Sequence, residues 1–241
     1  GYITRRTYNM RGELIQTIYA EGTADEQVLQ YEYDVIGRKI RDINALDHAT
    51  QYTYDAASQL ISITDPLSHT TTYSYTINGQ RNIITDANGR RTQLFYDERN
   101  RPTSTLYPDV STTTQVYDGA GQLLSQIDEL NRETKYTYDD VGRLLTVTNP
   151  LSQTTIYTYD NIGNLASVTD ANGNVTQFSY DALDRLAQKI WPDSSYEAYT
   201  YDLVGNLVEH RLTDGAVNTF SYDLMDRLIE ANYFDGQNIT Y

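Results

Sequence analysis

The sequence contains no cysteine, which excludes disulfides, thiol catalysis and cysteine-ligated zinc. It has two Met and four Phe, and no apolar run approaches the roughly 18 residues that a membrane-spanning helix requires, so we expect no membrane span. Basic residues are scarce: 18 Lys and Arg face 33 Asp and Glu, which leaves a net charge of −15. A surface this negative repels phosphate groups, so we expect no nucleic-acid partner. The chain starts with neither an initiator Met nor a signal peptide, and we expect it to be excised from a longer protein.

Tyrosine is the abundant residue, with 23 copies in 241 residues. Together with frequent Thr, it is typical of a half-wetted β-surface and not of a thick apolar core. Eleven tyrosines, nine of them followed by Asp, mark a repeat whose first interval is 25 residues and whose next nine intervals are 21 residues. Tyr8 comes first, and we call the ten that follow the ladder tyrosines: Tyr33, Tyr54, Tyr75, Tyr96, Tyr117, Tyr138, Tyr159, Tyr180, Tyr201 and Tyr222. Tyr241 holds the same place in a twelfth unit.

Each repeat contains two turn signals. Four residues after the tyrosine comes Gly, Asn, Asp or Ser, as at Gly142 and Gly163, and most of these residues tolerate the positive φ of a tight return. A second turn follows about twelve residues after the tyrosine, where Asn-Gly, Asp-Gly or Pro recurs. The segments between the turns alternate as strands do, for example over 154–159. Turns are therefore predicted near 55–58, 66–69, 87–89, 139–142 and 171–173, and a longer loop is predicted over 20–28, inside the 25-residue interval.

These signals predict an all-β fold in which tandem 21-residue β-hairpin repeats form a long coiled antiparallel ribbon of about twenty strands. Residues 1–241 show no linker, so we expect one array of eleven repeats. A propeller blade has four strands and would give a 42-residue pattern, whereas the second-turn triplets recur every 84 residues. Duplication of a four-repeat block explains this longer period, and a structural equivalence of units four apart is the alternative.

The repeated motif identifies a family. Tyr136-Thr137-Tyr138-Asp139-Asp140-Val141-Gly142-Arg143-Leu144 resembles the YD-repeat, or RHS-repeat, proteins over nearly the whole chain. That family includes bacterial polymorphic toxins, the C components of insecticidal Tc toxins and animal teneurins. The resemblance implies a β-ribbon that spirals into a hollow shell and, in bacterial toxins, encloses a C-terminal toxin domain. It implies as partners the rest of the parent shell and the enclosed toxin, and a secreted or cell-surface location. The segment that closes such shells is not found here, so the resemblance covers the wall.

The Asp after each tyrosine has two interpretations. Evenly spaced carboxylates such as Asp139 and Asp160 suggest calcium ligands, but equivalent residues lie two strands apart, roughly 9.5 Å, which is too far to share one ion. We therefore expect each carboxylate to accept backbone N–H groups within its own turn. The tyrosines likewise offer either cross-strand packing or a carbohydrate-binding surface, and we favour packing.

Other polar residues point to no specific site. His48 and His69 are 21 residues apart at equivalent turns, too far apart for one metal ion, so we expect solvated side chains. An arginine recurs five residues after several tyrosines, as at Arg38 and Arg143. These arginines could bind an anion or could pair with neighbouring Asp side chains and backbone carbonyls, and we favour the pairing. No nucleophile elbow, P-loop or HExxH motif occurs, so we predict no catalytic residue, no metal site and no cofactor.

Two functional hypotheses follow. The first is a non-enzymatic structural scaffold, a wall segment whose repeat ladder consists of the ladder tyrosines with Asp139, Asp160, Gly142 and Gly163. The second is a cell-surface module that binds glycan or protein through a Tyr-rich face. For either, unpaired strand edges near the first repeat and near Tyr241 predict edge-to-edge self-association.

Overall fold

The computed structural model describes residues 3–240, so Tyr241 and the first two residues lie outside the part of the chain described below. Every regular element in that range is a β-strand, which confirms the all-β prediction, and there are 23 strands rather than about twenty. The strands are β1 (Arg5–Tyr8), β2 (Leu14–Tyr19), β3 (Gln27–Tyr33), β4 (Lys39–Ile43), β5 (Ala49–Tyr54), β6 (Leu60–Thr64), β7 (Thr70–Tyr75), β8 (Arg81–Thr85), β9 (Arg91–Tyr96), β10 (Pro102–Leu106), β11 (Thr112–Tyr117), β12 (Leu123–Ile127), β13 (Glu133–Tyr138), β14 (Leu144–Thr148), β15 (Thr154–Tyr159), β16 (Leu165–Thr169), β17 (Val175–Tyr180), β18 (Leu186–Ile190), β19 (Tyr196–Tyr201), β20 (Leu207–Arg211), β21 (Val217–Tyr222), β22 (Leu228–Asn232) and β23 (Asn238–Thr240).

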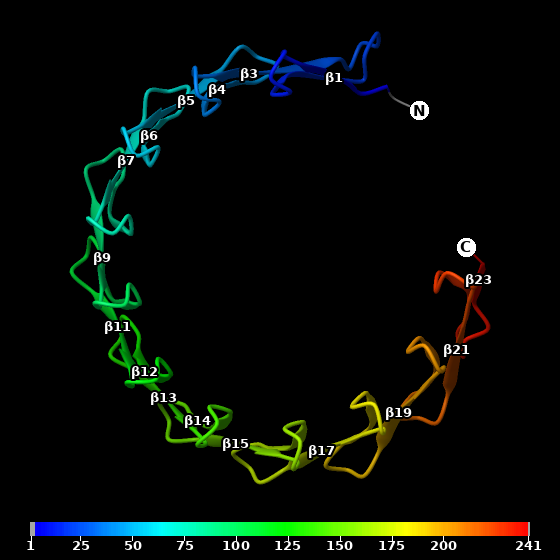
Figure 1. Cartoon of the computed structure of the whole chain (residues 1–241). Helices are drawn as coiled ribbons and strands as arrows, with labels where there is room; N and C mark the ends of the chain where they lie inside the picture. Colours follow the sequence, from blue (N-terminus) through cyan, green and yellow to red (C-terminus); the bar gives the residue numbers. More distant parts are fainter. Residues whose placement is uncertain (1–2, 241) are drawn as a thin grey trace. The chain divides into compact units, whose positions relative to one another are not determined.

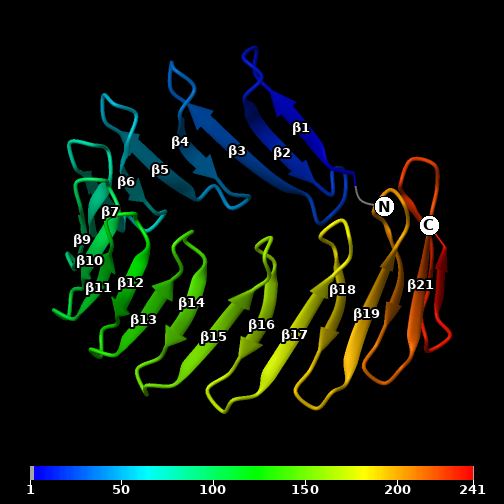
Figure 2. The same cartoon turned by 60° about the horizontal axis from the view of Figure 1, so that its bottom comes forward.

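The chain divides into two compact units. Unit 1 comprises Gly1–Gln115 and Ile127–Asn131, and unit 2 comprises Val116–Gln126 and Arg132–Tyr241. In unit 1, each strand from β1 to β11 pairs antiparallel with the next (Figure 1). In unit 2, the same pattern runs from β13 to β23, and Figure 2 shows these strands side by side. Each unit is therefore a single-layer antiparallel ribbon in which sequence neighbours are spatial neighbours.

Most ladder tyrosines lie where the strand register of their hairpin shifts. Between β15 and β16, Thr158 pairs with Ser167 but the next residue, Tyr159, pairs with Leu165, so Ala166 is an extra residue. The same shift recurs at the ends of β3, β5, β7, β13, β17, β19 and β21. A bulge of this kind bends the strand and increases its local twist. The bulge therefore gives these repeats the same built-in bend.

The two turns of a repeat have the same geometry. In the first, the N–H of Gly142 donates to the carbonyl of Asp139 at 3.0 Å, and the N–H of Asp139 donates to the carbonyl of Arg143 at 2.9 Å. Gly142 has φ of 89°. The second turn repeats this from Asn149 to Gln153, where Ser152 has φ of 61°. Both are type I turns followed by a left-handed residue, the usual three-residue hairpin loop.

The predicted turn positions are confirmed, although the Asn-Gly pairs do not form two-residue loops. Gly89 has φ of 77°, whereas Asn88 is not among the residues with positive φ, so Asn-Gly supplies only the left-handed end of the longer loop. The predicted long loop is also confirmed and spans 20–26, between β2 and β3. In the Pro-containing turns, Pro66 follows the first turn residue, where its fixed φ suits a type I turn.

Val110 should be a strained position. It has φ of 65°, although a β-branched residue strongly disfavours this conformation, and its side chain is exposed, so no packing offsets the strain. We expect Val110→Gly to raise the free energy of unfolding by about 1 kcal/mol, because relief of the left-handed strain exceeds the extra unfolded-state entropy of glycine. Gly89→Val, at the equivalent place one repeat earlier, should lower it. Urea unfolding midpoints test both, and a Val110→Gly midpoint at or below that of the parent chain would contradict the assignment of strain.

The ribbon has almost no interior. Among residues 3–240, the buried apolar side chains are Ile18 and Ala231, and the buried polar ones are Thr17, Ser125 and Asn218. The other described side chains are half-buried or exposed. Stability must therefore come from contacts between adjacent hairpins, as in other repeat proteins.

Candidate functional site

The ladder tyrosines connect each hairpin to the preceding one. The Tyr159 hydroxyl donates a hydrogen bond of 2.9 Å to the carbonyl of Leu144, at the start of β14. Backbone pairing between β14 and β15 begins only at Thr146, so the hydroxyl supplies a partner where the strand ladder has ended. In residues 3–240 the equivalent bond, at 2.7–3.1 Å, is made by Tyr33, Tyr54, Tyr75, Tyr96, Tyr138, Tyr159, Tyr180, Tyr201 and Tyr222. Tyr117 lies at the same place, at the end of β11.

The aspartate after each tyrosine caps its own turn, as the sequence suggested. One carboxylate oxygen of Asp139 accepts the N–H groups of Val141 at 3.1 Å and Arg143 at 2.8 Å. The backbone N–H of Arg143 lowers the pKa of Asp139 most, burial partly opposes this, and the Arg143 guanidinium lowers it further. Asp160 accepts three backbone N–H groups in the same way, and Gly163, with φ of 107°, closes its turn. The carboxylates thus act within single turns.

An arginine joins this cap to the next repeat. Arg143 Nε donates to the second carboxylate oxygen of Asp139 at 2.7 Å, and its guanidinium lies 4.7 Å from the ring centroid of Tyr159. The same stacking occurs for Arg38 on Tyr54 and for Arg185 on Tyr201. The Asp–Arg pairing was predicted from the sequence, but the stacking was not. The constant offset of 16 residues from arginine to the following tyrosine was the available signal.

The histidines form no shared centre. His69 lies 2.9 Å from Asp65 in its own turn and is exposed, as is His48. Residues 3–240 contain no cluster of three or more His, Asp or Glu side chains that could hold a metal ion.

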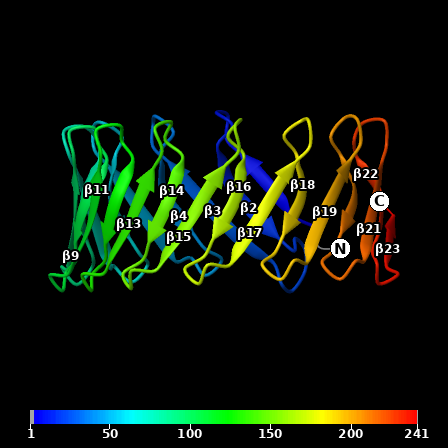
Figure 3. The same cartoon turned by 90° about the horizontal axis from the view of Figure 1, so that it is seen from below.

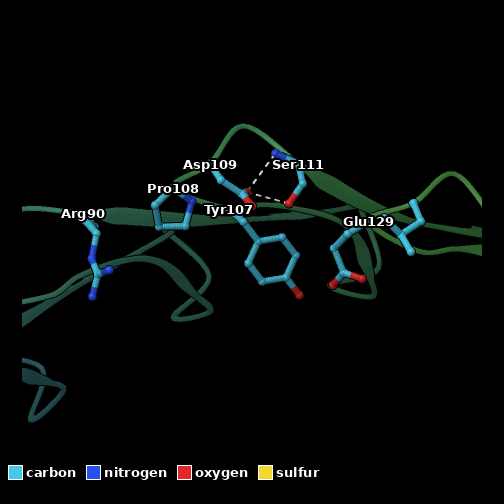
Figure 4. A pocket seen from close by; sticks show the side chains of 7 residues that line it. Arg90, Tyr107, Pro108, Asp109, Ser111 and Glu129 are labelled. Atoms are coloured by element: carbon cyan, nitrogen blue, oxygen red, sulfur yellow. Dashed lines mark hydrogen bonds between the residues drawn. The ribbon is translucent and has the colours of Figure 1, made fainter.

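Two grooves occupy equivalent places, one in each unit. Figure 4 shows the unit 1 groove, of about 550 Å³, with the Tyr107 ring between Pro108 and Glu129. It is lined by Arg90, Tyr107, Pro108, Asp109, Ser111, Glu129 and Leu130. The unit 2 groove, of about 580 Å³, is lined by Asn174, Trp191, Pro192, Asp193, Ser195, Glu197 and Thr213. Six positions of the first list recur 84 residues later in the second: Pro, Asp and Ser are kept, whereas Arg90, Tyr107 and Glu129 are replaced by Asn174, Trp191 and Thr213. The 84-residue period thus coincides with a surface feature.

The second turn beside each groove begins with an aromatic residue, Tyr107 or Trp191. Other second turns begin with Asp or Asn, as at Asp65 and Asn149. In these turns the capping carboxylate comes from the residue two positions later. Asp109 accepts hydrogen bonds from the N–H of Ser111 at 3.0 Å and from its hydroxyl at 2.6 Å. Asp193 and Ser195 repeat this arrangement. Each turn remains capped while an aromatic ring lines the groove.

The unit 2 groove has a charged wall. Glu197 accepts a hydrogen bond of 2.6 Å from the Tyr199 hydroxyl and lies 3.4 Å from His210 Nε2. The bond from Tyr199 lowers the pKa of Glu197, whereas burial, followed by this bond, raises the pKa of Tyr199 to about 12. Lys189 Nζ lies 3.6 Å from the Trp191 ring centroid. This cluster was not predicted from the sequence, because its members are scattered over three strands.

Comparison with protein-family models identifies the family of this chain. The model of the Teneurin YD-shell family matches residues 2–189, more than half of the chain. The chain belongs to the Teneurin YD-shell family. An RHS Repeat model matches residues 199–237 of this YD-shell chain, which confirms the resemblance seen in its motifs. The family is of a structural shell-repeat type. No curated protein matches the chain.

Solved structures agree on the fold. The YD-shell chain is similar to the crystal structure of TcdB2-TccC3-TEV, with 19% identity and a TM-score of 0.60 over 95% of this chain and 16% of that one. It is also similar to TcdB2-TccC3 without its hypervariable C-terminal region, with 18% identity and a TM-score of 0.50 over 95% of this chain and 17% of that one. The chain therefore spans about a sixth of these relatives. No helix in residues 3–240 is long and apolar enough to cross a membrane.

Proposed function

We propose that residues 1–241 are a non-enzymatic wall segment of a β-shell that encloses a C-terminal toxin domain. The observation that carries this proposal is the repeated link from one hairpin to the next. Arg143 binds Asp139 of its own turn and stacks on Tyr159 of the next repeat. The Tyr159 hydroxyl returns a hydrogen bond to the preceding hairpin. A link made at every repeat suits a continuous wall, because no hairpin depends on a central core.

This proposal assigns the ladder tyrosines, Asp139, Asp160, Gly142 and Gly163 a structural role. It treats residues 1–241 as one array of eleven repeats, continuous with the rest of the parent shell. It also places the protein outside the cell or on its surface, where shells that carry toxins act. The ladder side chains are equivalent from repeat to repeat, so none of them is singled out, which argues against catalysis by the ladder.

Electron microscopy of the longer polypeptide that contains this array tests the proposal. We expect the ribbon to line a closed cavity, and we expect the segment within the cavity to resist protease until the wall is unfolded. An open ribbon with a protease-sensitive C-terminal region would contradict the enclosing function.

A second candidate function, saccharide binding, is favoured by the paired grooves. The ladder hydroxyls are already hydrogen-bonded to backbone carbonyls, so the grooves suit this function better than the ladder does. Each groove combines an aromatic ring with carboxylate and hydroxyl groups. Sugars present an apolar C–H face together with hydroxyl groups, which such a lining complements.

Trp191 is the single tryptophan of the chain, so its fluorescence reports directly on the unit 2 groove. If saccharides bind, titration with oligosaccharides should give a saturable change, and calorimetry should find two sites. Tyr107→Ala should remove one site and leave the fluorescence response intact, whereas Trp191→Ala should remove the other site. Tyr8→Ala, at an exposed tyrosine far along the chain from both grooves, serves as the control. If no glycan on an array binds saturably, saccharide binding is contradicted and the scaffold function is the one that remains.

A further inference from the structure

The unit 2 groove has a cation that the protein itself supplies. The Lys189 ammonium lies 3.6 Å from the ring centroid of Trp191, and Lys189 pairs with Glu197 on the neighbouring strand. An ammonium over an aromatic face is attracted by the ring electrons, and a nearby carboxylate adds a charge interaction. This lysine therefore shows which chemical group the aromatic ring and the carboxylate of such a groove can hold.

The unit 1 groove has the same backbone but a neutral residue in place of that lysine. The backbone N–H groups of Tyr107 and Trp191 close their turns with equal hydrogen bonds of 2.9 Å. Thr105 stands 84 positions before Lys189, and both residues pair with the strands on either side in the same register. Because Thr105 carries no charge, it brings no ammonium to the Tyr107 ring.

The carboxylates of the unit 1 groove are not neutralised. Glu129 and Asp109 line the groove, and neither makes an ion pair in residues 3–240. Arg90, the cationic residue of the lining, already binds Asp86 at 2.7 Å. Figure 4 shows Glu129 and the Tyr107 ring on the same side of the ribbon. This groove therefore offers a ligand an aromatic face and a net negative charge.

The length of the groove favours an oligomeric ligand. Arg90, Tyr107 and Glu129 come from three successive second turns. Figure 3 shows the corresponding turns of unit 2, between β16 and β21, in a row along one edge of the ribbon. Successive second turns are two strands apart, which corresponds to roughly 9.5 Å. A groove that crosses three such turns suits a short saccharide chain better than a single small amine.

We propose that the unit 1 groove binds a saccharide that carries a protonated amine, with the ammonium over Tyr107 and beside Glu129. The C–H face of the sugar packs on the ring while the charge is met by the carboxylate. This inference rests on the saccharide binding proposed above, and it names the class of sugar. The unit 2 groove lacks this preference, because Lys189 already occupies its ring. Acidic saccharides are rejected by the carboxylates.

Calorimetry with matched trisaccharides tests the preference. A β-1,4-linked glucosamine trisaccharide and its N-acetylated form differ only at the amine, and the glucose trisaccharide controls for the bulk of the acetyl group. In slightly acidic buffer, the glucosamine form should bind about tenfold tighter than either neutral form. Glu129→Gln should remove this difference. Glu98→Gln, at an exposed glutamate in a first turn, should retain it.

Exchange of the residues that distinguish the two grooves gives a sharper result. Thr105→Lys supplies the unit 1 ring with an ammonium of its own, so the glucosamine trisaccharide should bind that groove about tenfold more weakly. Lys189→Thr uncovers the Trp191 ring beside Glu197. The fluorescence response of Trp191 to the glucosamine trisaccharide should then occur at about tenfold lower concentration than in the parent chain. Circular dichroism checks that both variants fold.

A blocked trilysine peptide distinguishes an amino sugar from charge attraction to this acidic chain. It carries as many positive charges as the glucosamine trisaccharide, and it should bind more weakly. Equal binding by the peptide would overturn the saccharide as occupant. Equal binding of the three trisaccharides, or a preference that survives Thr105→Lys, would refute the ammonium site but leave saccharide binding standing. If no trisaccharide binds saturably, the saccharide function fails together with this inference.

Discussion

Tyr159→Ala is expected to lower the free energy of unfolding by about 2–3 kcal/mol. The substitution removes a half-buried ring, the guanidinium stacked on it at 4.7 Å, and the hydrogen bond to the Leu144 carbonyl. Tyr159→Phe keeps the ring and should cost about 1 kcal/mol, because only the hydrogen bond is lost. Chemical unfolding followed by circular dichroism measures both changes.

Tyr8 provides the matched control. It holds the same place in the first repeat, but it is 55% exposed, and β1, which carries it, is the first strand within residues 3–240. Tyr8→Ala should therefore cost under about 0.5 kcal/mol. Equal losses at Tyr8 and Tyr159 would refute the link between hairpins. Because contacts are local, losses at the distant Tyr54 and Tyr201 should add.

Acid is expected to weaken the ribbon in many turns at once. Hydrogen bonds and ion pairs hold the pKa below the ordinary value of 3.8 in these described residues: Asp34, Asp65, Asp86, Asp97, Asp109, Asp139, Asp160, Asp170, Asp181, Asp193, Asp202 and Asp223. A depressed folded-state pKa stabilises the fold above the unfolded-state pKa, and this stability is lost as pH falls through the folded-state value. We expect the melting temperature to fall by on the order of 10 °C between about pH 5 and pH 2.5.

High salt and one substitution separate the protonation of the turn carboxylates from the change in overall charge repulsion. Lowering the pH also relieves repulsion among the 33 acidic residues, so melting is measured at high salt, where that repulsion is screened. Asp139→Asn keeps an oxygen acceptor for the turn but does not titrate. The stability advantage of the parent chain over this variant should be largest near neutral pH and should diminish as the pH falls through the lowered pKa of Asp139. A constant difference across the whole range would contradict the role of the ionised carboxylate.

The sequence predicted the repeat well because one residue type serves the same contact in every copy. Tyr159 and its equivalents after Tyr33 bind the carbonyl fifteen residues earlier, so the 21-residue period is visible without a structure. The turn type was harder, since Asn88-Gly89 usually signals a two-residue loop. Only the backbone geometry revealed that both turns of a repeat are alike.

The grooves were not predicted from the sequence, for a different reason. Tyr107 and Trp191 look like lapses in the pattern of turn-opening Asp and Asn residues, and only the structure places Glu129 and Glu197 across from them. Exposed aliphatic residues in the turns, such as Ile162, were visible in the sequence. Whether Ile162 is buried or exposed depends, however, on the direction in which the turn projects, which the spacing does not encode.

The near absence of an interior has a thermal consequence. The heat capacity of unfolding arises mainly from newly hydrated apolar surface. A ribbon whose fully buried apolar side chains, within residues 3–240, are Ile18 and Ala231 exposes less of it on unfolding than a globular protein does. Its stability curve should therefore be flatter than that of a globular protein of equal length. A wall built in this way would keep nearly constant strength over a wide range of temperatures.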